Sequence, residues 1–342
     1  MKILFIIFDI LLITNCVAQA DTGFASHWEY KGIAVEERGY HIWSTSPIAG
    51  KGDSVHLFVA RWPEQYKVDP GWRSHSEIAH YVSANAEGPF IFSDIVLKGT
   101  GKNTWDKYGV ENPLIVKVGK LYVLFYISNN NYHQPPHPAN QKIGMLISKS
   151  LYGPWKKVNK DGEILKPPVK ETYWNYKATN GVNNPAFLQY KGAYFLYFKS
   201  QNAQMGLAIS ENLKGPYVQL PFPITKNNRT IEDGYAFFYN GKPALLTTDN
   251  HGILEKGGGI LWQSDDGIHF NEFQSGFHTI DYYVKDKVAL KPKWYYGSNA
   301  IMKFERPGIL LKEGKPAYLY VASGCNIYGG ESTISYVLKY KE

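Results

Sequence analysis

Carboxylates stand directly before apolar, strand-like segments at several places in this chain of 342 residues. Glu111 and the nearby Asp106 precede one such segment, Glu232-Asp233 precede a second, and Glu305 precedes a third. Carboxylates that crowd together raise one another's pKa, because each charge disfavours the next. Hydrolysis of a glycosidic bond needs such a set, since one carboxyl must stay protonated to donate to the leaving oxygen while another stays ionised to activate water. We therefore predict that these five carboxylates are catalytic candidates.

Polar residues at other strand ends are candidates for holding a substrate. Arg61 either neutralises a substrate carboxylate or sulfate or pairs with a neighbouring acid. His251, in the segment Asp249-Asn250-His251-Gly252, is a further catalytic candidate as an alternative acid. The residues predicted to bind substrate are Trp43, Arg61, His75, Glu77, Asn112, Asn184, Asp249 and Arg306. For Asn112 and Asn184, each of which stands before a proline, formation of a turn is the simpler explanation.

The segments that carry these residues repeat along the chain. A polar residue, then Pro or Gly, an apolar strand, a short turn and a second apolar strand recur at Ser46-Pro47, Asn112-Pro113, Asn184-Pro185, Asp233-Gly234 and Arg306-Pro307. Short strands repeated at roughly 50 to 75 residues are typical of β-propellers, in which each repeat is one four-stranded blade. We therefore predict an all-β fold, a five-bladed β-propeller in a single domain. The predicted blades span about 40–97, 111–158, 182–220, 231–273 and 304–340.

This architecture brings the candidate residues together. The innermost strand of each blade begins near the central axis, so the residues before these strands share one funnel. We expect Glu232 and Glu305 in one central pocket with their carboxyl groups less than about 10 Å apart, and the other catalytic candidates along its wall. A separation of about 6.5–9.5 Å, which opposite blades can supply, gives inversion of the anomeric configuration.

Turn residues and the termini complete the predicted ring. Gly119-Lys120, Lys191-Gly192 and Asn240-Gly241 stand where hairpin turns belong. Propellers commonly close by pairing a strand from one terminus with the blade at the other. The segment Gly39 to Ser44 and the C-terminal SYVLKY are the two candidates for that strand.

The N-terminal residues have a different character. Lys2 precedes a nearly continuous apolar stretch from Ile3 to Ile13, and Ala18-Gln19-Ala20 is a small-x-small cleavage site. This pattern predicts a signal peptide at 1–20, the propeller at 21–342, and a secreted or periplasmic protein. Processing as a lipoprotein at Cys16 is an alternative. No other stretch approaches membrane-spanning length, so we predict no integral membrane span in the mature chain.

Composition narrows the partners. The formal net charge of +7 is spread along the chain without a basic block or a recognition motif, so nucleic acid is not a predicted partner. The charge suits an acidic polysaccharide, and some of the aromatic residues, 15% of the chain, are placed to stack on sugar rings. No zinc-type Cys/His spacing occurs, and no metal or cofactor is predicted. The predicted partner is an oligosaccharide or polysaccharide.

At these repeats the chain resembles the five-bladed propeller glycosidases, families 43 and 117 of the glycoside hydrolases. The resemblance is carried by Asn112-Pro113 with GKLYVLFY, Asn184-Pro185 with GAYFLYF, Gly-Pro-aromatic segments such as Gly153-Pro154-Trp155, and Ile231-Glu232-Asp233. It spans nearly all of 21–342. It implies an exo-acting hydrolase that inverts the anomeric configuration, with acid and base on different blades. The leading hypothesis is a secreted enzyme acting on fragments of plant or algal polysaccharides.

One position departs from the family 43 pattern. That family carries its base as an Asp at the start of blade one, where this chain has Thr45-Ser46-Pro47. The base must then come from elsewhere, with Asp106 and Asp233 as candidates. A non-catalytic carbohydrate-binding propeller is the main alternative. A phosphorylase similar to family 130 is another, for which only Arg306, Arg61 and the histidines offer phosphate ligands.

Among the carboxylates we favour Glu232 as the acid. Asp233 beside it and Glu305 on the next blade supply a negative field, which raises the pKa of a neighbouring carboxyl. In family 117 a His is implicated as the acid, so the resemblance makes His251 the rival.

Overall fold

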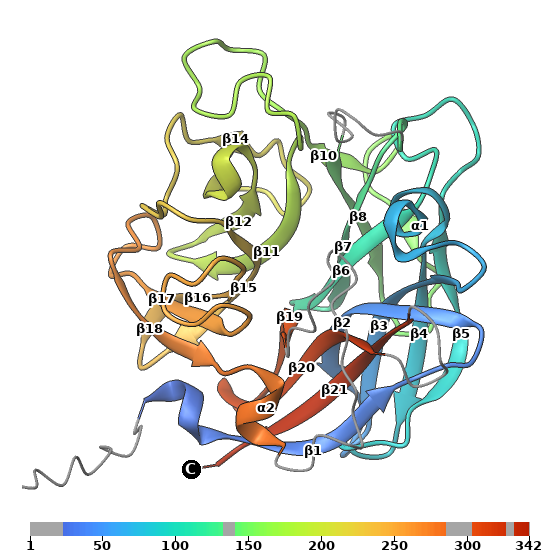
Figure 1. Cartoon of the computed structure of the whole chain (residues 1–342). Coiled ribbons are helices and arrows are strands. Elements are labelled where there is room, and N and C mark those ends of the chain that lie inside the picture. The colour runs from blue at the N-terminus through green and yellow to red at the C-terminus, as the bar shows by residue number, and fades with distance from the viewer. Residues whose placement is uncertain (1–22, 133–140, 285–302, 326–331, 342) are drawn as a thin grey trace, which may run out of the picture.

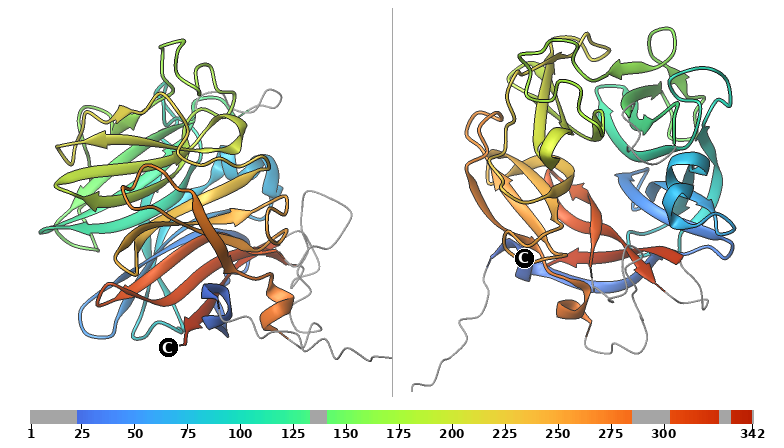
Figure 2. Two further views of the ribbon diagram at one scale, coloured as in Figure 1. Left: turned by 90° about the vertical axis from the view of Figure 1, so that its left-hand side faces the viewer. Right: turned by 45° about the horizontal axis from the view of Figure 1, so that its top comes forward.

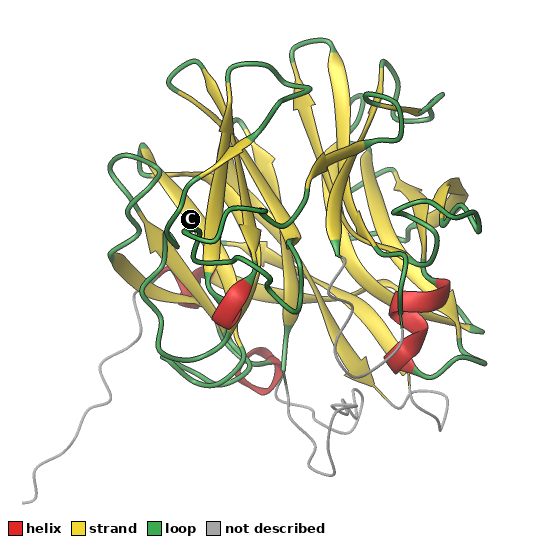
Figure 3. Ribbon diagram, turned by 90° about the horizontal axis from the view of Figure 1, so that it is seen from above, coloured by secondary structure: helices red, strands yellow, loops and turns green. Residues whose placement is uncertain are grey.

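Strands make up nearly all of the regular structure in the residues that the computed structural model describes, which are 23–132, 141–284, 303–325 and 332–341 (Figures 1 and 3). The predicted signal peptide and Cys16 lie outside these residues. The short helices are η1 (Phe24–His27), α1 (Val68–His75), η2 (Gln201–Ala203) and α2 (Ile280–Tyr283). None of the helices in the described ranges is long and apolar enough to cross a membrane.

The strands form five antiparallel sheets that follow one another around a ring, as Figure 2 shows, and this confirms the predicted five-bladed propeller. Blade one consists of β2 (Tyr40–Ala49), β3 (Val55–Pro63), β4 (Glu77–Ser83) and β5 (Ile91–Lys98). Blade two consists of β6 (Val110–Val118), β7 (Leu121–Ser128), β8 (Lys142–Ser148), β9 (Lys156–Lys157) and β10 (Glu163–Leu165). Blade three consists of β11 (Asn183–Tyr190), β12 (Ala193–Lys199), β13 (Met205–Ser210) and β14 (Val218–Gln219). Blade four consists of β15 (Ile231–Tyr239), β16 (Lys242–Asp249), β17 (Gly259–Gln263) and β18 (Glu272–Phe277).

Blade five joins the two ends of the chain. Its strands β19 (Glu305–Lys312), β20 (Lys315–Cys325) and β21 (Ser332–Tyr340) are completed by β1 (Trp28–Val35), which pairs with β21. The expected mode of closure is therefore confirmed, and SYVLKY lies in the pairing strand β21. The N-terminal candidate was wrong, because Gly39 to Ser44 crosses from a turn into β2 and the closing strand lies upstream of it.

The inner strand of every blade has the same distortion near its start. Each contains one residue with positive φ that is not glycine, and the pairing register shifts at that point. These residues are Ser44 (φ 52°), Asn112 (51°), Asn184 (51°), Asp233 (65°) and Arg306 (54°). Such a bulge bends the strand and re-aims the side chains beside it. The bulge residues therefore mark the equivalent position in all five blades.

Blade one differs from the predicted register. The sequence places its repeat at Ser46-Pro47, but the bulge lies two residues earlier, at Ser44. Pro47 pairs regularly with Leu57 inside β2, so the proline is part of the strand and does not mark its start. Trp43 is consequently the blade-one counterpart of Glu111, Glu232 and Glu305.

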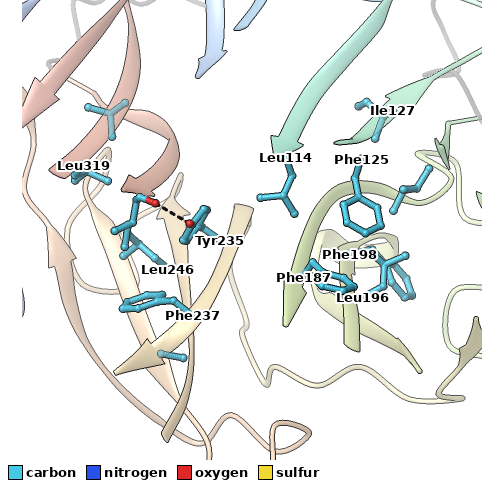
Figure 4. Packing of buried hydrophobic residues seen from close by; sticks show 14 of the residues in the cluster. Leu114, Phe125, Ile127, Phe187, Leu196, Phe198, Tyr235, Phe237, Leu246 and Leu319 are labelled. Atoms are coloured by element: carbon cyan, nitrogen blue, oxygen red, sulfur yellow. Dashed lines mark hydrogen bonds between the residues drawn. The ribbon is translucent and has the colours of Figure 1, made fainter. Parts of the chain in front are cut away.

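Apolar side chains from neighbouring blades meet between the sheets (Figure 4). Phe125 of blade two packs against Phe187 of blade three, with 5.0 Å between ring centroids. Tyr235 of blade four donates a hydrogen bond of 2.7 Å to the carbonyl of Ile309 in blade five. Close packing of this kind fixes the angle between blades. It therefore also fixes how the inner strands approach the axis.

Candidate functional site

The five bulge residues form a hydrogen-bonded belt around the axis. Ser44 Oγ donates to Asn112 Oδ1 (2.6 Å), Asn112 Nδ2 to Asn184 Oδ1 (2.6 Å), and Asn184 Nδ2 to Asp233 Oδ1 (2.9 Å). Arg306 Nη1 reaches the same Asp233 oxygen at 3.1 Å. We call these residues the axial belt. Asn112 and Asn184, predicted to bind substrate or to form turns, have their side chains engaged in this belt, and both adopt the positive φ that Asn tolerates well.

Asp233 is the acceptor on which the belt converges. Its Oδ1 accepts from Asn184 and Arg306, and its Oδ2 accepts from Thr248 Oγ1 (3.1 Å) and the backbone N–H of Arg306 (3.3 Å). Only 3% of Asp233 is exposed. A buried carboxylate with two donors on each oxygen is a fixed negative charge. This environment does not suit the role of water-activating base that the sequence suggested.

Each bulge residue follows the residue that opens toward the site, and here two glutamates meet. Glu232 directly precedes the bulge residue of β15, and Glu305 directly precedes the bulge residue of β19, on neighbouring blades. One carboxylate oxygen from each of Glu232, Asp233 and Glu305 lies within 4.8 Å of the others. The expected meeting of Glu232 and Glu305 at the axis is therefore observed. This closeness of single oxygens meets the expectation that the two carboxyl groups share one pocket.

Two buried lysines pair with the glutamates. Lys199, the last residue of β12, forms an ion pair with Glu232 Oε1, and Lys303, just before β19, forms one with Glu305 Oε1. The side chains of Lys199 and Lys303 are only 8% and 6% exposed. Sequence reasoning missed both. The available signal for Lys199 is a charged residue closing an otherwise apolar strand, AYFLYFK, opposite Asn183.

The surroundings shift the pKa values of the two glutamates in opposite directions. Burial raises the pKa of Glu305 to about 8, and the charges of Asp233 and Glu232 add to this, while Lys303 only partly opposes it. Burial would also raise the pKa of Glu232, but the ion pair with Lys199, the charge of Lys303 and a hydrogen bond with Asn250 together lower it. These opposite directions of the pKa favour Glu305, rather than the predicted Glu232, as the protonated member of the pair.

Glu111 approaches the belt from blade two. It is 4% exposed, and its Oε1 accepts no hydrogen bond from the described residues. Burial raises the pKa of Glu111 well above its usual range, and Arg306 and Arg73 oppose this effect while Asp233 and Asp69 add to it. Arg73, on the helix α1 that is inserted between β3 and β4, is itself paired with Asp69. Burial therefore favours the neutral form of the Glu111 carboxyl group.

Blade one presents an aromatic side chain at the equivalent position. Trp43 is 8% exposed and packs with Trp62, Val68 and Ala322. Tyr66 and Trp72, from the segment that contains α1, border the same cluster. Trp43 therefore occupies in blade one the place that Glu111, Glu232 and Glu305 occupy in their blades.

Several of the predicted site residues lie away from this cluster and interact with other parts of the fold. Asp106 is 1% exposed and bonds to Thr104 (2.9 Å) and to Lys157 of β9, because loop 98–110 folds back onto blade two. It was expected on the wall of the funnel and is instead inside a blade. Arg61 pairs with Glu77 (3.0 Å) and Glu37 (2.5 Å), and its guanidinium lies over the rings of Tyr40 and Phe92. Of the two roles proposed for Arg61, pairing with a neighbouring acid is the one observed. The same ion pair occupies the side chain of Glu77, which was predicted to bind substrate.

The remaining candidates lie in loops. Asp249 is fully buried and accepts hydrogen bonds from the backbone N–H groups of residues 252 to 255, at 2.7 to 3.0 Å. Its carboxylate is therefore occupied by the fold, which corrects the prediction of substrate binding. His251, in the loop that Asp249 organises, is exposed, and Arg229 donates to its carbonyl (3.1 Å). His75 is exposed and stacks on Tyr66, with 3.5 Å between ring centroids.

Comparison with known proteins places the fold. No protein-family model and no curated protein matches the chain. Among solved structures, Zg3597, a family 117 glycoside hydrolase from the marine bacterium Zobellia galactanivorans, is 15% identical with a TM-score of 0.63, over 91% of this chain and 90% of that one. A family 43 β-xylosidase/α-arabinofuranosidase from a compost microbial metagenome is 12% identical with a TM-score of 0.57, over 92% and 94%.

A third similar structure comes from family 130, described as mannoside phosphorylases that include glycoside hydrolases acting on β-1,2 mannosidic linkages. It is 15% identical with a TM-score of 0.60, over 93% of this chain and 95% of that one. These identities are too low to transfer an activity. The chain has the five-bladed propeller fold that these glycoside hydrolase families share.

Proposed function

We propose that the protein is a secreted, exo-acting glycoside hydrolase that cleaves oligosaccharides derived from plant or algal polysaccharides. The observation that carries the proposal is the pair Glu232 and Glu305, whose carboxylate oxygens lie close together at the propeller axis and whose surroundings shift their pKa values in opposite directions. Two carboxyl groups whose environments separate their pKa values are the acid and the ionised partner that glycoside hydrolysis requires. The signal-like residues 1–20 support secretion.

The chemistry assigns one task to each residue. Glu305, protonated up to about pH 8, donates its proton to the glycosidic oxygen as the bond breaks. Glu232, ionised beside Lys199, meets the positive charge that develops on the sugar ring. Asp233, held by four donors, keeps a fixed negative charge next to Glu305 and thereby favours its protonated form.

The test is turnover of a panel of aryl glycosides together with plant and algal oligosaccharides by the purified protein. Glu305→Gln keeps the shape but removes the transferable proton, so kcat should fall about 10²–10⁴-fold for oligosaccharides. The loss should be much smaller for dinitrophenyl glycosides, whose leaving group needs little protonation. The wild-type kcat/KM should decline above about pH 8. Glu163→Gln, in β10 and paired with Lys142, is a matched control and should retain activity.

Trp43 favours one second candidate, a carbohydrate-binding propeller without catalysis. Blade one lacks the aspartate of the family 43 pattern and presents Trp43 at the place equivalent to Glu232 and Glu305, and aromatic rings stack on sugars. Binding of oligosaccharides without turnover of any member of the panel would establish this alternative. A phosphorylase is less well supported, because Arg306 and Arg61, its predicted phosphate ligands, are both paired with carboxylates.

A further inference from the structure

The longest loop in the described ranges lies away from the propeller axis. Residues 166–182 run from β10 of blade two to β11 of blade three without forming a helix or a strand. Loops longer than about 12–15 residues are uncommon in compact domains, and many of them are functional. None of the residues that form the axial site belongs to this loop, so its length calls for a different explanation.

A groove of about 550 Å³ opens where this loop leaves blade two. One wall consists of Asn159 and residues 163–169 of blade two, and the other consists of residues 214–217 and Gln219 of blade three. β10 and β14 are the outermost strands of these blades, so the groove lies on the circumference of the ring (Figure 1). The outermost strand of a four-stranded blade is three inter-strand spacings, about 14 Å, from the innermost one. The groove is therefore separate from the axial belt, and its volume is in the range of about 300–1,000 Å³ that is typical of ligand sites.

The shape of the groove is fixed by contacts between its walls. Gln219 Nε2 on blade three donates a hydrogen bond of 2.7 Å to the carbonyl of Lys166 on blade two. Pro167 and Pro168 in one wall and Pro216 in the other restrict the backbone, because the ring of proline fixes φ. A site that is rigid before binding loses little conformational entropy when a ligand binds.

Each wall carries a positive charge. The side chain of Lys166 on blade two is 64% exposed, and Lys214 on blade three is also exposed. Glu163 lies 3.8 Å from Lys166 but only 2.6 Å from Lys142, so its charge is already largely compensated. In the described ranges no residue forms an ion pair with Lys214. The groove therefore has an excess of ammonium groups that a negatively charged ligand can reach.

Apolar groups accompany these charges. Ile164, Pro168 and Pro216 line the groove, and Val169, which also lines it, is 87% exposed. A sugar ring presents C–H groups on its faces and polar groups at its rim, so a surface of this mixed kind suits a polysaccharide. Carboxylate or sulfate groups on that polysaccharide would form charge-assisted contacts with the ammonium groups. The net charge of +7 attracts the same class of polymer.

An extended peptide suits this surface less well, because it would need a free strand edge to pair with. β14 has two residues, and Pro216 stands just before it. β10 has three residues, and its pairing register shifts within them. Short and irregular edges of this kind resist the addition of a strand. The observations therefore favour a polysaccharide.

We propose that the groove between blades two and three binds an acidic polysaccharide, separately from the axial site. Lys166 and Lys214 contact the anionic groups, and the prolines and Val169 contact the faces of the sugar rings. A polymer bound in this way raises the effective concentration of its own chain ends near the axis of the same molecule. Binding does not require catalysis at the axis, so the inference stands independently of the proposed function.

Isothermal titration calorimetry of the purified protein tests the proposal with galacturonate oligomers, sulfated galactan oligomers and neutral galactan oligomers. We expect at least one of the two anionic ligands to bind, and the neutral one to bind more weakly. Binding of either anionic ligand also tells whether carboxylate or sulfate is recognised, and binding of neither overturns the proposal. The affinity should fall as the salt concentration rises to about 1 M, where the Debye length is about 3 Å.

A double variant locates the site. Lys166→Ala/Lys214→Ala should weaken binding of the anionic oligomer about two- to thirtyfold, since exposed ion pairs contribute modestly. Lys312→Ala/Lys315→Ala, in the hairpin between β19 and β20, removes the same charge from exposed positions of blade five and should bind like the wild type. Equal weakening in both double variants would show a general effect of net charge and would overturn the proposal. All of these positions are exposed, so the variants should keep the wild-type Tm.

Val169 and Glu305 provide two further tests. Val169→Asp should weaken binding and Val169→Lys should strengthen it, because the substitution changes the charge of the groove at an exposed position. Glu305→Gln should bind the oligomer as the wild type does, and a loss of binding in that variant would place the ligand at the axis and contradict the proposal. Tighter binding of polyglutamate than of either anionic oligomer, weakened by Lys166→Ala/Lys214→Ala, would identify an acidic peptide as the ligand and overturn the assignment to a polysaccharide.

Discussion

At the residue scale, the charge of Lys199 makes the pKa of Glu232 differ from that of Glu305. It is buried, it pairs with Glu232, and it is the strongest of the influences that lower the pKa of that carboxyl against the effect of burial. Lys303 plays the same part for Glu305 but is outweighed by burial and by two neighbouring negative charges. The proton therefore resides on Glu305 because of where two lysines stand.

Replacement of Lys199 by Met should move the acidic limb of the pH profile. Without the ammonium, burial dominates and raises the pKa of Glu232, so the ionised form is lost at a higher pH. We expect the acidic limb of kcat/KM to shift upward by at least about one unit, which is about a tenfold loss of kcat/KM on that limb. Lys242→Met, which removes an exposed lysine paired with Asp265, is the control. An unchanged limb would show that Lys199 does not set the charge of Glu232.

At the scale of elements, the loop between β16 and β17 depends on one side chain. The carboxylate of Asp249 accepts hydrogen bonds from four backbone N–H groups of this loop, which have no backbone acceptor of their own. Charge-assisted hydrogen bonds of this kind are stronger than neutral ones. The loop in turn carries Asn250, which bonds to Glu232. Asp249 therefore supports the site from outside it.

Asp249→Ala should lower the free energy of unfolding by about 2–4 kcal/mol, because several buried N–H groups lose their acceptor together. The measurement is the urea midpoint at constant m-value. Asp265→Ala, whose side chain is 82% exposed, should change stability by less than about 0.5 kcal/mol. If the Asp249 variant keeps wild-type stability but loses binding of oligosaccharides, the original assignment to substrate binding would be restored.

Blade one contains a chain of titrating groups across its strands. His56 Nδ1 and His80 Nε2 are 2.8 Å apart, and His80 Nδ1 lies 3.0 Å from Asp94. Burial lowers the pKa of His56 to about 4, and the neighbouring His80 adds to this. Burial also lowers the pKa of His80, against the opposing effect of Asp94.

The folded blade should therefore lose stability in acid. Between about pH 6.5 and pH 4 the unfolded histidines bind protons that the folded ones do not. The stability that these groups contribute is present above about pH 6.5 and declines as the pH falls toward 4. We expect Tm to fall across this window and to fall less steeply in His56→Gln. The exposed His269→Gln should follow the wild-type slope, and an equal slope in all three proteins would contradict the assignment.

The whole molecule is held as a ring by its N-terminal segment. β1 completes blade five, and Trp28 at its start is 2% exposed and donates to the carbonyl of Gly276 in blade four (2.9 Å). The same segment continues into β2 of blade one. Three blades therefore depend on this single stretch of chain, which lies at the seam of the ring (Figure 1).

Trp28→Ala should cost about 3–5 kcal/mol, because a large buried ring and its hydrogen bond are lost together. Chemical unfolding followed by fluorescence and circular dichroism measures this, and the two signals should change together. Phe273→Ala, which removes a ring of β18 that is 46% exposed, should cost far less. A Trp28 variant as stable as the Phe273 variant would show that closure does not depend on this contact.

Much of the architecture could be read from the sequence because its causes are local. Period-two apolar strands and turns such as Lys191-Gly192, where both residues have positive φ, predicted the hairpins correctly. Five repeats of that unit predicted the propeller, and the convergence of inner strands predicted that Glu232 and Glu305 meet. These inferences need only neighbouring residues and the general geometry of one fold.

The tertiary structure alone decided the register of blade one and the state of the site. A proline directly after a bulge residue and a proline farther along the strand look alike in sequence, so the shift from Ser46-Pro47 to Trp43-Ser44 became visible only in the pairing of β2 with β3. The partners of charged groups also come from distant parts of the chain, as Lys199 does for Glu232 and Lys157 does for Asp106. A carboxyl group holds or releases its proton according to burial and nearby charge, and both are properties of the assembled blades rather than of any segment.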